Sequence, residues 1–375
     1  LQVASSGVDL CIEGGEGRIH FQVQDYSFYR PEGSLAYSTW DASNEGFVSA
    51  INDILPAPSS VKLDSEVFEF DKRGAVVTYD LLGLIYWSLA RVEEIGSKNL
   101  DCYQRFPATS SHAYKYGYLD RPFIDEWLFI LAQVIQRVWP EAVLKKHRFS
   151  ISVSHDVDSP SLYAFKDWKA IARMMAGHLI KRRDVKAFLT APYVRLMTKS
   201  HLNGQDPFNT FDWIMDMSEK NNIKSAFYFI AGCTDLEKDG DYKLEHPVIR
   251  NLIKRISDRG HEIGLHPSFN SFLRPEIIKG EAESLRLVCR KEGVKQRVWG
   301  GRMHYLRWQT PITMQAWNDS GMDYDSTLGY ADRPGFRCGT CFEYPAFNHE
   351  FQRQLNLRIR PLVVMESTLL EEGYM

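Results

Sequence analysis

Two short motifs carry the kinds of side chain that hydrolytic metal sites use. The first reads Ser-His-Asp-Val-Asp over 154–158, and the second reads His-Glu-Ile-Gly-Leu-His over 261–266. Both motifs place carboxylates and imidazoles at the point where a predicted strand ends and a loop begins. Barrels of alternating strands and helices build hydrolytic metal sites at such positions.

In the first motif, Asp156 and Asp158 follow a predicted strand over 149–153. An extended backbone points residues two apart to the same side, so one carboxylate can bind a metal while the other takes a proton. The same pattern also fits a turn, or a cap for a helix after Pro160. The motif taken alone does not choose between these readings.

In the second motif, His261 and His266 are five residues apart. On a strand, an odd separation places two side chains on opposite faces, so they should not share a metal. His266 lies at the loop end and is the better ligand. We expect His261 to pack behind the strand.

A third group follows another predicted strand that begins at residue 298. Arg302 can orient a catalytic carboxylate through paired hydrogen bonds. His304 can act as a general acid for the leaving group, or as a metal ligand. Arg307 and Trp308 can line a sugar site by charge and stacking, and we also assign His155 to substrate binding.

From about residue 148, predicted strands and helices alternate along the chain. The expected strands cover 149–153, 226–230, 262–266, 298–299 and 322–324, and the expected helices begin near 211, 247, 275 and 311. Such alternation is typical of a parallel sheet, either open or closed into a barrel. Periodicity does not choose between the two.

The residues before this point read as a separate α+β accessory domain. Ile19 and Phe21 alternate with polar residues as in a half-buried strand, Asp80 can cap one helix, and Pro122 can open another. This part of the chain holds no cluster of ligand-type residues.

Composition excludes several classes of protein. The chain has 44% apolar residues, as a globular core requires, and a net charge of −3 gives no general attraction to nucleic acid. No run approaches the ~18 apolar residues of a membrane span. Six cysteines without framework spacing predict a cytoplasmic location. Cys338 and Cys341 are expected to pack rather than to act as a redox pair, because the context of such a motif is missing.

The segment 166–186 combines seven basic residues with several apolar ones. A basic amphipathic helix of this kind can attract an anionic glycan or a lipid headgroup. It can also be an ordinary solvated helix face.

These motifs, in this order, resemble the polysaccharide deacetylase superfamily, the fold of chitooligosaccharide and peptidoglycan N-deacetylases. The resemblance covers about residue 148 to the end, and its most specific parts are 154–158, 225–229, 259–268 and Arg302. It extends to a bacterial branch with an extra domain before the deacetylase fold. It implies an α/β fold, a distorted (β/α)7 barrel over 148–375 after a smaller α+β domain over 1–147. We expect the barrel to be incomplete at its C-terminus.

The resemblance also implies a divalent metal, usually zinc, held by one Asp and two His. Asp156 matches the catalytic base, Asp158 the metal-binding Asp, and His266 the first metal-binding His. Arg302 matches the arginine that supports the base. Because Val157 separates the two aspartates, their roles are exchangeable.

Two family positions differ in this chain. Asn270 stands where the second metal-binding His is usual, and we assign it as the third ligand on that match alone. The element that carries the acid His is not visible, and His304 is assigned its function.

We therefore predict a zinc-dependent N-deacetylase acting on an acetamido sugar of a bacterial polysaccharide or its precursor. One alternative is a carbohydrate-binding scaffold without a metal, with Asn270 as the trace of that loss. Another is a hydrolase of a different non-peptide C–N bond. The expected partner is a carbohydrate, not nucleic acid, and neither the sugar nor the oligomeric state follows from the sequence.

Overall fold

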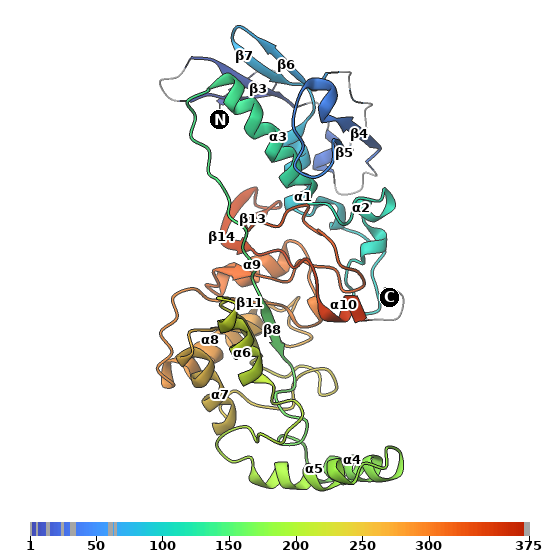
Figure 1. The fold of residues 1–375 in the computed structure, drawn as a ribbon, viewed down its shortest axis with the longest axis vertical. Coiled ribbons are helices and arrows are strands. Elements are labelled where there is room, and N and C mark those ends of the chain that lie inside the picture. Colours follow the sequence, from blue (N-terminus) through green and yellow to red (C-terminus); the bar gives the residue numbers. More distant parts are fainter. Residues whose placement is uncertain are drawn as a thin grey trace. The chain divides into compact units, whose positions relative to one another are not determined.

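The protein is described here by a computed structural model that covers 2–4, 7–12, 16–23, 26–30, 35–58, 63 and 66–370 (Figure 1). The chain divides into two compact units. Unit 1 comprises Leu1–Arg148 and Thr327–Met375, and unit 2 comprises Phe149–Ser326. The predicted boundary near residue 148 coincides with the first division, whereas the residues from 327 onward group with unit 1.

Unit 1 contains a mixed sheet of order β1-β2-β3-β7-β6, in which β3 and β7 are parallel and the other neighbours antiparallel. Two further antiparallel hairpins are β4–β5 and β13–β14. The strands are β1 (Gln2–Ala4), β2 (Gly7–Leu10), β3 (Arg18–Gln22), β4 (Tyr37–Asp41), β5 (Ile54–Pro58), β6 (Phe68–Asp71), β7 (Gly74–Val77), β13 (Tyr344–Asn348) and β14 (Arg353–Ile359). The α-helices are α1 (Leu81–Leu89), α2 (His112–Lys115), α3 (Phe123–Val138) and α10 (Glu366–Leu370).

The predicted start signals of two helices in unit 1 are confirmed. The Asp80 side chain accepts a hydrogen bond from the backbone N–H of Gly83 at 2.8 Å and so caps α1. Helix α3 begins directly after Pro122. It buries Trp127 completely, with the indole ring stacked on Trp40 at 5.1 Å between centroids. This aromatic packing contributes to the core of the unit.

Residues after 327 join unit 1 through buried polar contacts. Arg337 Nη2 lies 2.7 Å from the Glu94 carboxylate, and both side chains are buried. Breaking such a pair by removing one partner costs about 3–5 kcal/mol. Ser88 Oγ also donates to the carbonyl of Cys338 at 2.9 Å. The residues from 327 onward thus group with unit 1.

The Cys338 and Cys341 thiols are both free. Burial raises the pKa of Cys338, and burial together with the Asp125 carboxylate raises the pKa of Cys341 to about 11. Both therefore stay protonated near neutral pH, which favours packing over thiolate chemistry.

Unit 2 is built on parallel strands in the order β12-β11-β10-β9-β8. The strands are β8 (Ser154–Val157), β9 (Ala226–Ile230), β10 (Glu262–His266), β11 (Gly300–Gly301) and β12 (Tyr324–Asp325). The α-helices are α4 (Trp168–Ile180), α5 (Val185–Met197), α6 (Phe211–Lys220), α7 (Pro247–Asp258), α8 (Pro275–Lys291) and α9 (Ile312–Asp319). Because the strands are parallel, their carboxyl ends meet at one edge.

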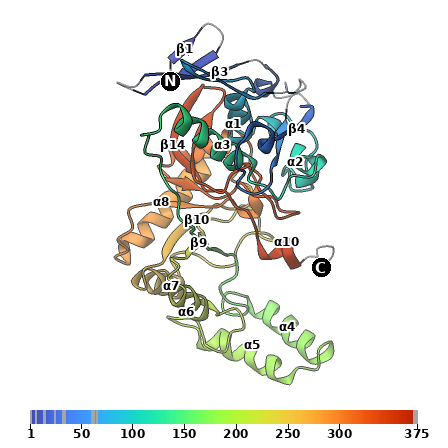
Figure 2. The same ribbon diagram turned by 45° about the horizontal axis from the view of Figure 1, so that its top comes forward.

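The α/β character of this part of the chain is confirmed, but closure of the sheet is not. Among the described residues, no strand pairing joins β8 to the far side of the sheet. Helices α6 and α7 lie side by side in Figures 1 and 2. Arg259, directly after α7, forms an ion pair with Asp216 of α6 at 2.6 Å. No helix in the described ranges is long and apolar enough to cross a bilayer.

The first predicted strand is wrong in position. Residues 149–153 form no strand, and Phe149 and Ile151 are 91% and 56% exposed. Pairing with β9 begins instead at Ser154, opposite Ala226. The aspartate motif thus lies largely within the strand, and the pleat of β8 sets the direction of its side chains.

Candidate metal centre

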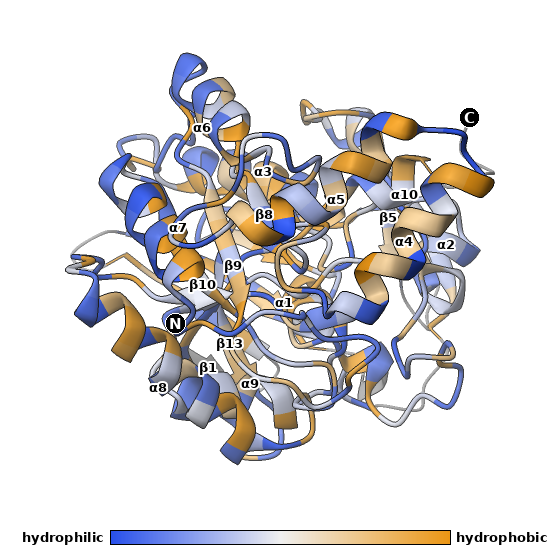
Figure 3. Cartoon of the chain, turned by 90° about the horizontal axis from the view of Figure 1, so that it is seen from below, coloured by the Kyte–Doolittle hydropathy of each residue, from blue (hydrophilic) through white to orange (hydrophobic). Residues whose placement is uncertain are grey.

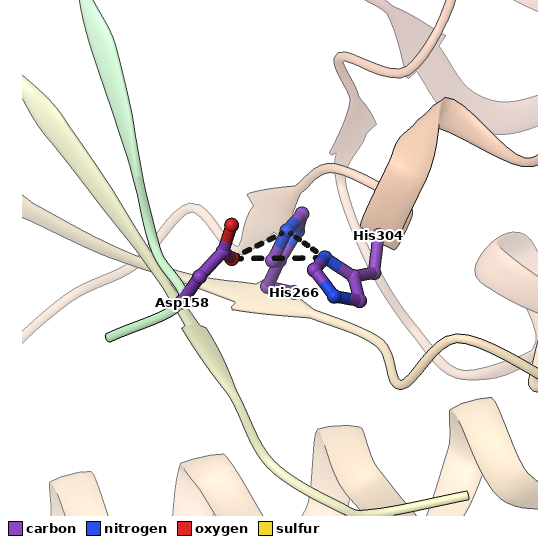
Figure 4. A group of neighbouring side chains, drawn as sticks. All are labelled: Asp158, His266 and His304. Atoms are coloured by element: carbon purple, nitrogen blue, oxygen red, sulfur yellow. Dashed lines mark hydrogen bonds and ion pairs between the residues drawn. The ribbon is translucent and has the colours of Figure 1, made fainter. Parts of the chain in front are cut away.

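Three ligand-type side chains converge at the carboxyl edge of the unit 2 sheet (Figure 4). Asp158 follows β8, His266 ends β10, and His304 follows β11. Asp158 Oδ1 lies 3.3 Å from His266 Nε2 and 3.6 Å from His304 Nδ1. One ligand atom from each residue lies within 4.8 Å of the others. A single small cation can reach all three.

Backbone carbonyls define which ring nitrogens carry protons. His266 Nδ1 lies 2.6 Å from the carbonyl oxygen of Arg302, and His304 Nε2 lies 2.8 Å from that of Lys238. A carbonyl oxygen can only accept, so both of these nitrogens donate. In neutral rings, the other nitrogens, His266 Nε2 and His304 Nδ1, then carry lone pairs that face each other at 2.9 Å.

This donor set fits a divalent cation. Two lone pairs that face each other beside a carboxylate repel each other unless a proton or a metal cation lies between them. Metal-binding histidines commonly donate their second N–H to a backbone carbonyl, which fixes the ring orientation, and both His266 and His304 do so. One carboxylate and two imidazoles leave a position open on a tetrahedral zinc ion.

The pKa shifts of His266 and Asp158 indicate a position that favours positive charge, whereas that of His304 does not. Burial alone would lower the pKa of His266, but the Asp156 and Asp158 carboxylates outweigh burial and raise it. Burial works against ionisation of Asp158 as well, but the hydrogen bond and charge of His266 lower its pKa. Burial and the neighbouring His266 lower the pKa of His304.

Arg302 orients the second aspartate of the motif. Its Nη1 donates to Asp156 Oδ1 at 2.9 Å, and its Nη2 donates to Ser154 Oγ at 2.7 Å. The buried guanidinium is anchored from behind, because Nε donates to the carbonyl of Ser326 at 3.0 Å. Asp156 Oδ2 lies 3.9 Å from His266 Nε2. One carboxylate oxygen is thus held, and the other faces the cluster.

A tight turn brings His304 into the cluster. Tyr305 and Leu306 have φ values of 59° and 54°, a left-handed conformation that side-chain-bearing residues rarely adopt. Each such residue costs on the order of 1 kcal/mol or more. Met303 before the turn and Leu306 within it are both buried, which anchors the turn.

Asn270, the predicted third ligand, has its carboxamide engaged elsewhere. Its Nδ2 donates to the carbonyl of Thr234 at 3.2 Å, and its Oδ1 accepts from Arg307 Nη1 at 3.1 Å. These bonds hold the loop after β10. The structure brings His304, not Asn270, into hydrogen-bonding distance of His266.

Two of the predicted substrate-binding residues are buried. Arg307 is buried between the rings of Phe269 and Phe272, at 4.2 and 3.9 Å from their centroids. Trp308 is buried and donates its indole N–H to a threonine hydroxyl.

His155 and His261 lie behind the sheet. Strand alternation turns His155 to the face opposite Asp156, where its ring lies 4.9 Å from Phe227. His261 packs behind β10 as expected, where its Nδ1 accepts from the backbone N–H of Ser225 at 3.2 Å.

Sequence reasoning missed two supporting side chains. Ser154, two residues before Asp156 on the same strand face, could have been found from strand periodicity. Glu281, on α8, offered no such signal. It is buried under the loop after His266, accepts from the Ser268 N–H at 2.8 Å, and has its pKa raised by burial to about 7.

Comparison with known proteins adds little to this geometry. A model described as "Family of unknown function (DUF7033)" matches residues 18–140, within unit 1. No curated protein matches the chain. Among solved structures, a "putative polysaccharide deacetylase" from Mycobacterium smegmatis matches at 16% identity with a TM-score of 0.31. The match covers 56% of this chain and only 57% of that one, and a TM-score this low carries no argument. The side-chain geometry of unit 2 is the stronger guide to function.

Proposed function

We propose that this chain is a metal-dependent hydrolase that removes N-acetyl groups from an acetamido sugar of a bacterial polysaccharide or its precursor. The observation that carries the proposal is the convergence of Asp158, His266 and His304, with two ring nitrogens free to face one cation. The acetamido sugar is proposed on the sequence resemblance, because the site geometry defines only the class of reaction.

Asp158, His266 Nε2 and His304 Nδ1 would hold the cation, for which zinc is the best match to two nitrogens and one oxygen. Bound zinc polarises a carbonyl group and lowers the pKa of a water molecule. The carbonyls of Arg302 and Lys238 keep both imidazole rings in the required tautomer. His304 is therefore proposed as the third ligand in place of Asn270.

Asp156 is proposed as the general base. Arg302 holds one of its oxygens, and the other faces the cluster, within reach of a water molecule placed there. The carboxylate takes a proton from the attacking water and can return it to the departing amine. This assignment frees His304 from the acid role, because its Nε2–H is already donated to the Lys238 carbonyl.

The test is acetate release by the zinc-loaded full chain from acetylated chitooligosaccharides. We expect one acetate for each amine formed, and loss of activity with a chelator that added zinc reverses. Asp156→Asn should retain zinc yet lose about 100-fold or more in kcat, because the general base is gone.

Zinc content of matched variants separates the metal site from the choice of substrate. His304→Ala should lose zinc, whereas Asn270→Ala and His261→Ala should retain it. Zinc retained by His304→Ala but lost from Asn270→Ala would contradict the ligand assignment. A metal-free protein that still binds glycan would favour the alternative of a carbohydrate-binding scaffold without a metal. A zinc-containing protein that is inactive on acetylated sugars but cleaves another amide would show that the substrate belongs to a different class.

A further inference from the structure

The hairpin formed by α4 and α5 presents an apolar stripe to solvent. On α5, Val185, Leu189, Tyr193 and Leu196 recur every three or four residues and are 56%, 61%, 44% and 59% exposed. The opposite side of the hairpin is packed, since Ala191 and other residues of α5 meet α4 in a small buried core. The stripe is therefore a second apolar face, separate from the one that stabilises the hairpin.

The same hairpin concentrates positive charge. The segment 166–199 has nine Lys and Arg residues against two Asp residues, a net charge of +7, whereas the whole chain carries −3. Both aspartates, Asp167 and Asp184, cap the starts of the two helices. At the turn of the hairpin, residues 181–183 are exposed, and no ion pair joins them to another described residue. In Figure 3, orange segments alternate with blue ones along α4 and α5.

Next to the stripe lies an open groove of about 670 Å³. Its lining combines Leu189 and Tyr193 of the stripe with Lys186 and with residues 204–207. The lining is mixed, because Thr190, Gln205 and Asp206 also contribute to it. Of these groups, Lys186 can contact an anionic headgroup, while Leu189 and Tyr193 belong to the apolar stripe.

We propose that the α4–α5 hairpin docks this protein on an anionic phospholipid bilayer. The helices would lie in the interface, with the stripe of α5 among the acyl chains and the basic turn against the headgroups. This inference stands independently of the proposed hydrolase activity, because none of the candidate metal ligands lies in the hairpin.

Other binding partners of the hairpin would account for either its positive charge or its apolar stripe, but not for both. A soluble polyanion, such as an acidic glycan or nucleic acid, would neutralise the basic turn but leave the apolar stripe in water. A second copy of the chain could cover the stripe, but it would bring two surfaces of charge +7 together. An anionic bilayer accounts for both features, because its acyl chains cover the apolar stripe and its headgroups neutralise the basic turn.

The test is sedimentation of the full chain with vesicles of phosphatidylcholine, with and without phosphatidylglycerol. We expect binding only to the anionic vesicles, weakened by added salt. Leu189→Glu combined with Leu196→Glu should weaken it by more than about tenfold, since two charges enter the apolar phase. Lys181→Glu combined with Arg182→Glu should do the same, because each basic residue near an anionic surface contributes roughly fivefold.

Matched controls lie elsewhere in unit 2. Leu236→Glu changes a side chain that is 93% exposed, and Arg290→Glu with Lys291→Glu reverses two adjacent charges at the end of α8. Both controls should bind as the unaltered chain does, and circular dichroism should show all variants folded.

Three results would overturn the proposal. One is no binding to anionic vesicles at low salt, or binding that the hairpin variants leave unchanged. Another is a dimer of the unaltered chain that Leu189→Glu converts to a monomer, which would make the stripe an interface between copies. The third is vesicle binding lost with Lys181→Glu and Arg182→Glu but kept with Leu189→Glu and Leu196→Glu, which would indicate a polyanion surface.

Discussion

At His266 and His304, the position of one proton on each ring decides what the site can bind. If either ring were turned over, its N–H would point into the cluster and oppose a cation. The carbonyls of Arg302 and Lys238 prevent this, because each accepts a hydrogen bond from the outer nitrogen of one ring. Outer partners of this kind are commonly worth about 10–100-fold in metal affinity.

Glu281 is a second buried carboxyl group close to the site. Both of its oxygens accept from Ser268, at 2.8 Å from the backbone N–H and 2.5 Å from the hydroxyl. Burial outweighs these bonds and raises the pKa of Glu281 to about 7. The folded state is therefore most stable when Glu281 is protonated. The loop after His266 packs against this side chain through Ser268.

The raised pKa predicts a pH-dependent stability. Because the folded state holds the Glu281 proton more tightly than the unfolded state, whose pKa is near 4.5, stability falls as pH rises through about 7. The loss amounts to about 3 kcal/mol at most. Glu281→Gln does not titrate, so its unfolding free energy should rise relative to that of the unaltered chain between about pH 5 and about pH 8.

Denaturant unfolding of metal-free protein measures this difference. Glu283→Gln, an exposed position on the same helix, is the control and should follow the unaltered chain at both pH values. An equal pH dependence for Glu281→Gln and the unaltered chain would show that Glu281 is ionised in the fold.

Residue spacing predicted part of the site. The resemblance pairs Arg302 with Asp156 and Asp158 with His266, and in the structure Arg302 donates to Asp156 and Asp158 lies 3.3 Å from His266. The roles of these residues stay predictions. Asn270 was a positional match, but its carboxamide bonds to a loop that only tertiary structure forms. The sequence does not decide whether His304 is a general acid or a metal ligand, because the left-handed turn that directs its ring contains no glycine that would mark it.

At the scale of elements, glycines within β10 and β11 allow the close packing of the unit 2 sheet. A Cβ atom on Gly301 would lie 1.8 Å from the carbonyl oxygen of Leu265 on β10. A Cβ atom on Gly264 would lie 2.4 Å from the ring of Tyr228. The missing side chains leave room for buried aromatic rings and for the strand that leads into Arg302.

Gly301→Ala should therefore destabilise the fold by about 1–3 kcal/mol, the usual cost of overpacking a buried position. It should also lower zinc affinity, because Arg302 and its carbonyl shift with the backbone. Gly280→Ala, in helix α8 with nothing within 4 Å of the new methyl group, should leave stability equal or up to about 1 kcal/mol higher. Denaturant midpoints compare the two, and a Gly301→Ala protein of unchanged midpoint would contradict the close approach of β10 and β11.

Element positions followed from the sequence wherever a start signal or a long apolar run marked them. Strands β9 and β10 and helices α7 and α8 begin where expected. Strand β8 was misplaced, because the alternating residues 149–153 are exposed while the polar residues after them pair with β9. Pairing energy, not local pattern, decided this position.

At the scale of the whole chain, unit 1 is assembled from two segments separated by all of unit 2. Contacts such as Arg337 with Glu94 join residues far apart in sequence and leave no periodic signal. For this reason the return of the chain to unit 1 at Thr327 could not be predicted. The charge is also divided unevenly, with +7 concentrated on residues 166–199 of unit 2.

The measurement that bears most directly on this account is a crystal structure of the zinc-loaded protein with anomalous scattering recorded at the zinc edge. We predict one strong peak about 2.0–2.2 Å from an Asp158 carboxylate oxygen, His266 Nε2 and His304 Nδ1, with Asp156 close by but not bound. Crystals grown with zinc that show no peak there, or zinc held elsewhere while both imidazoles stay unbound, would contradict this ligand assignment.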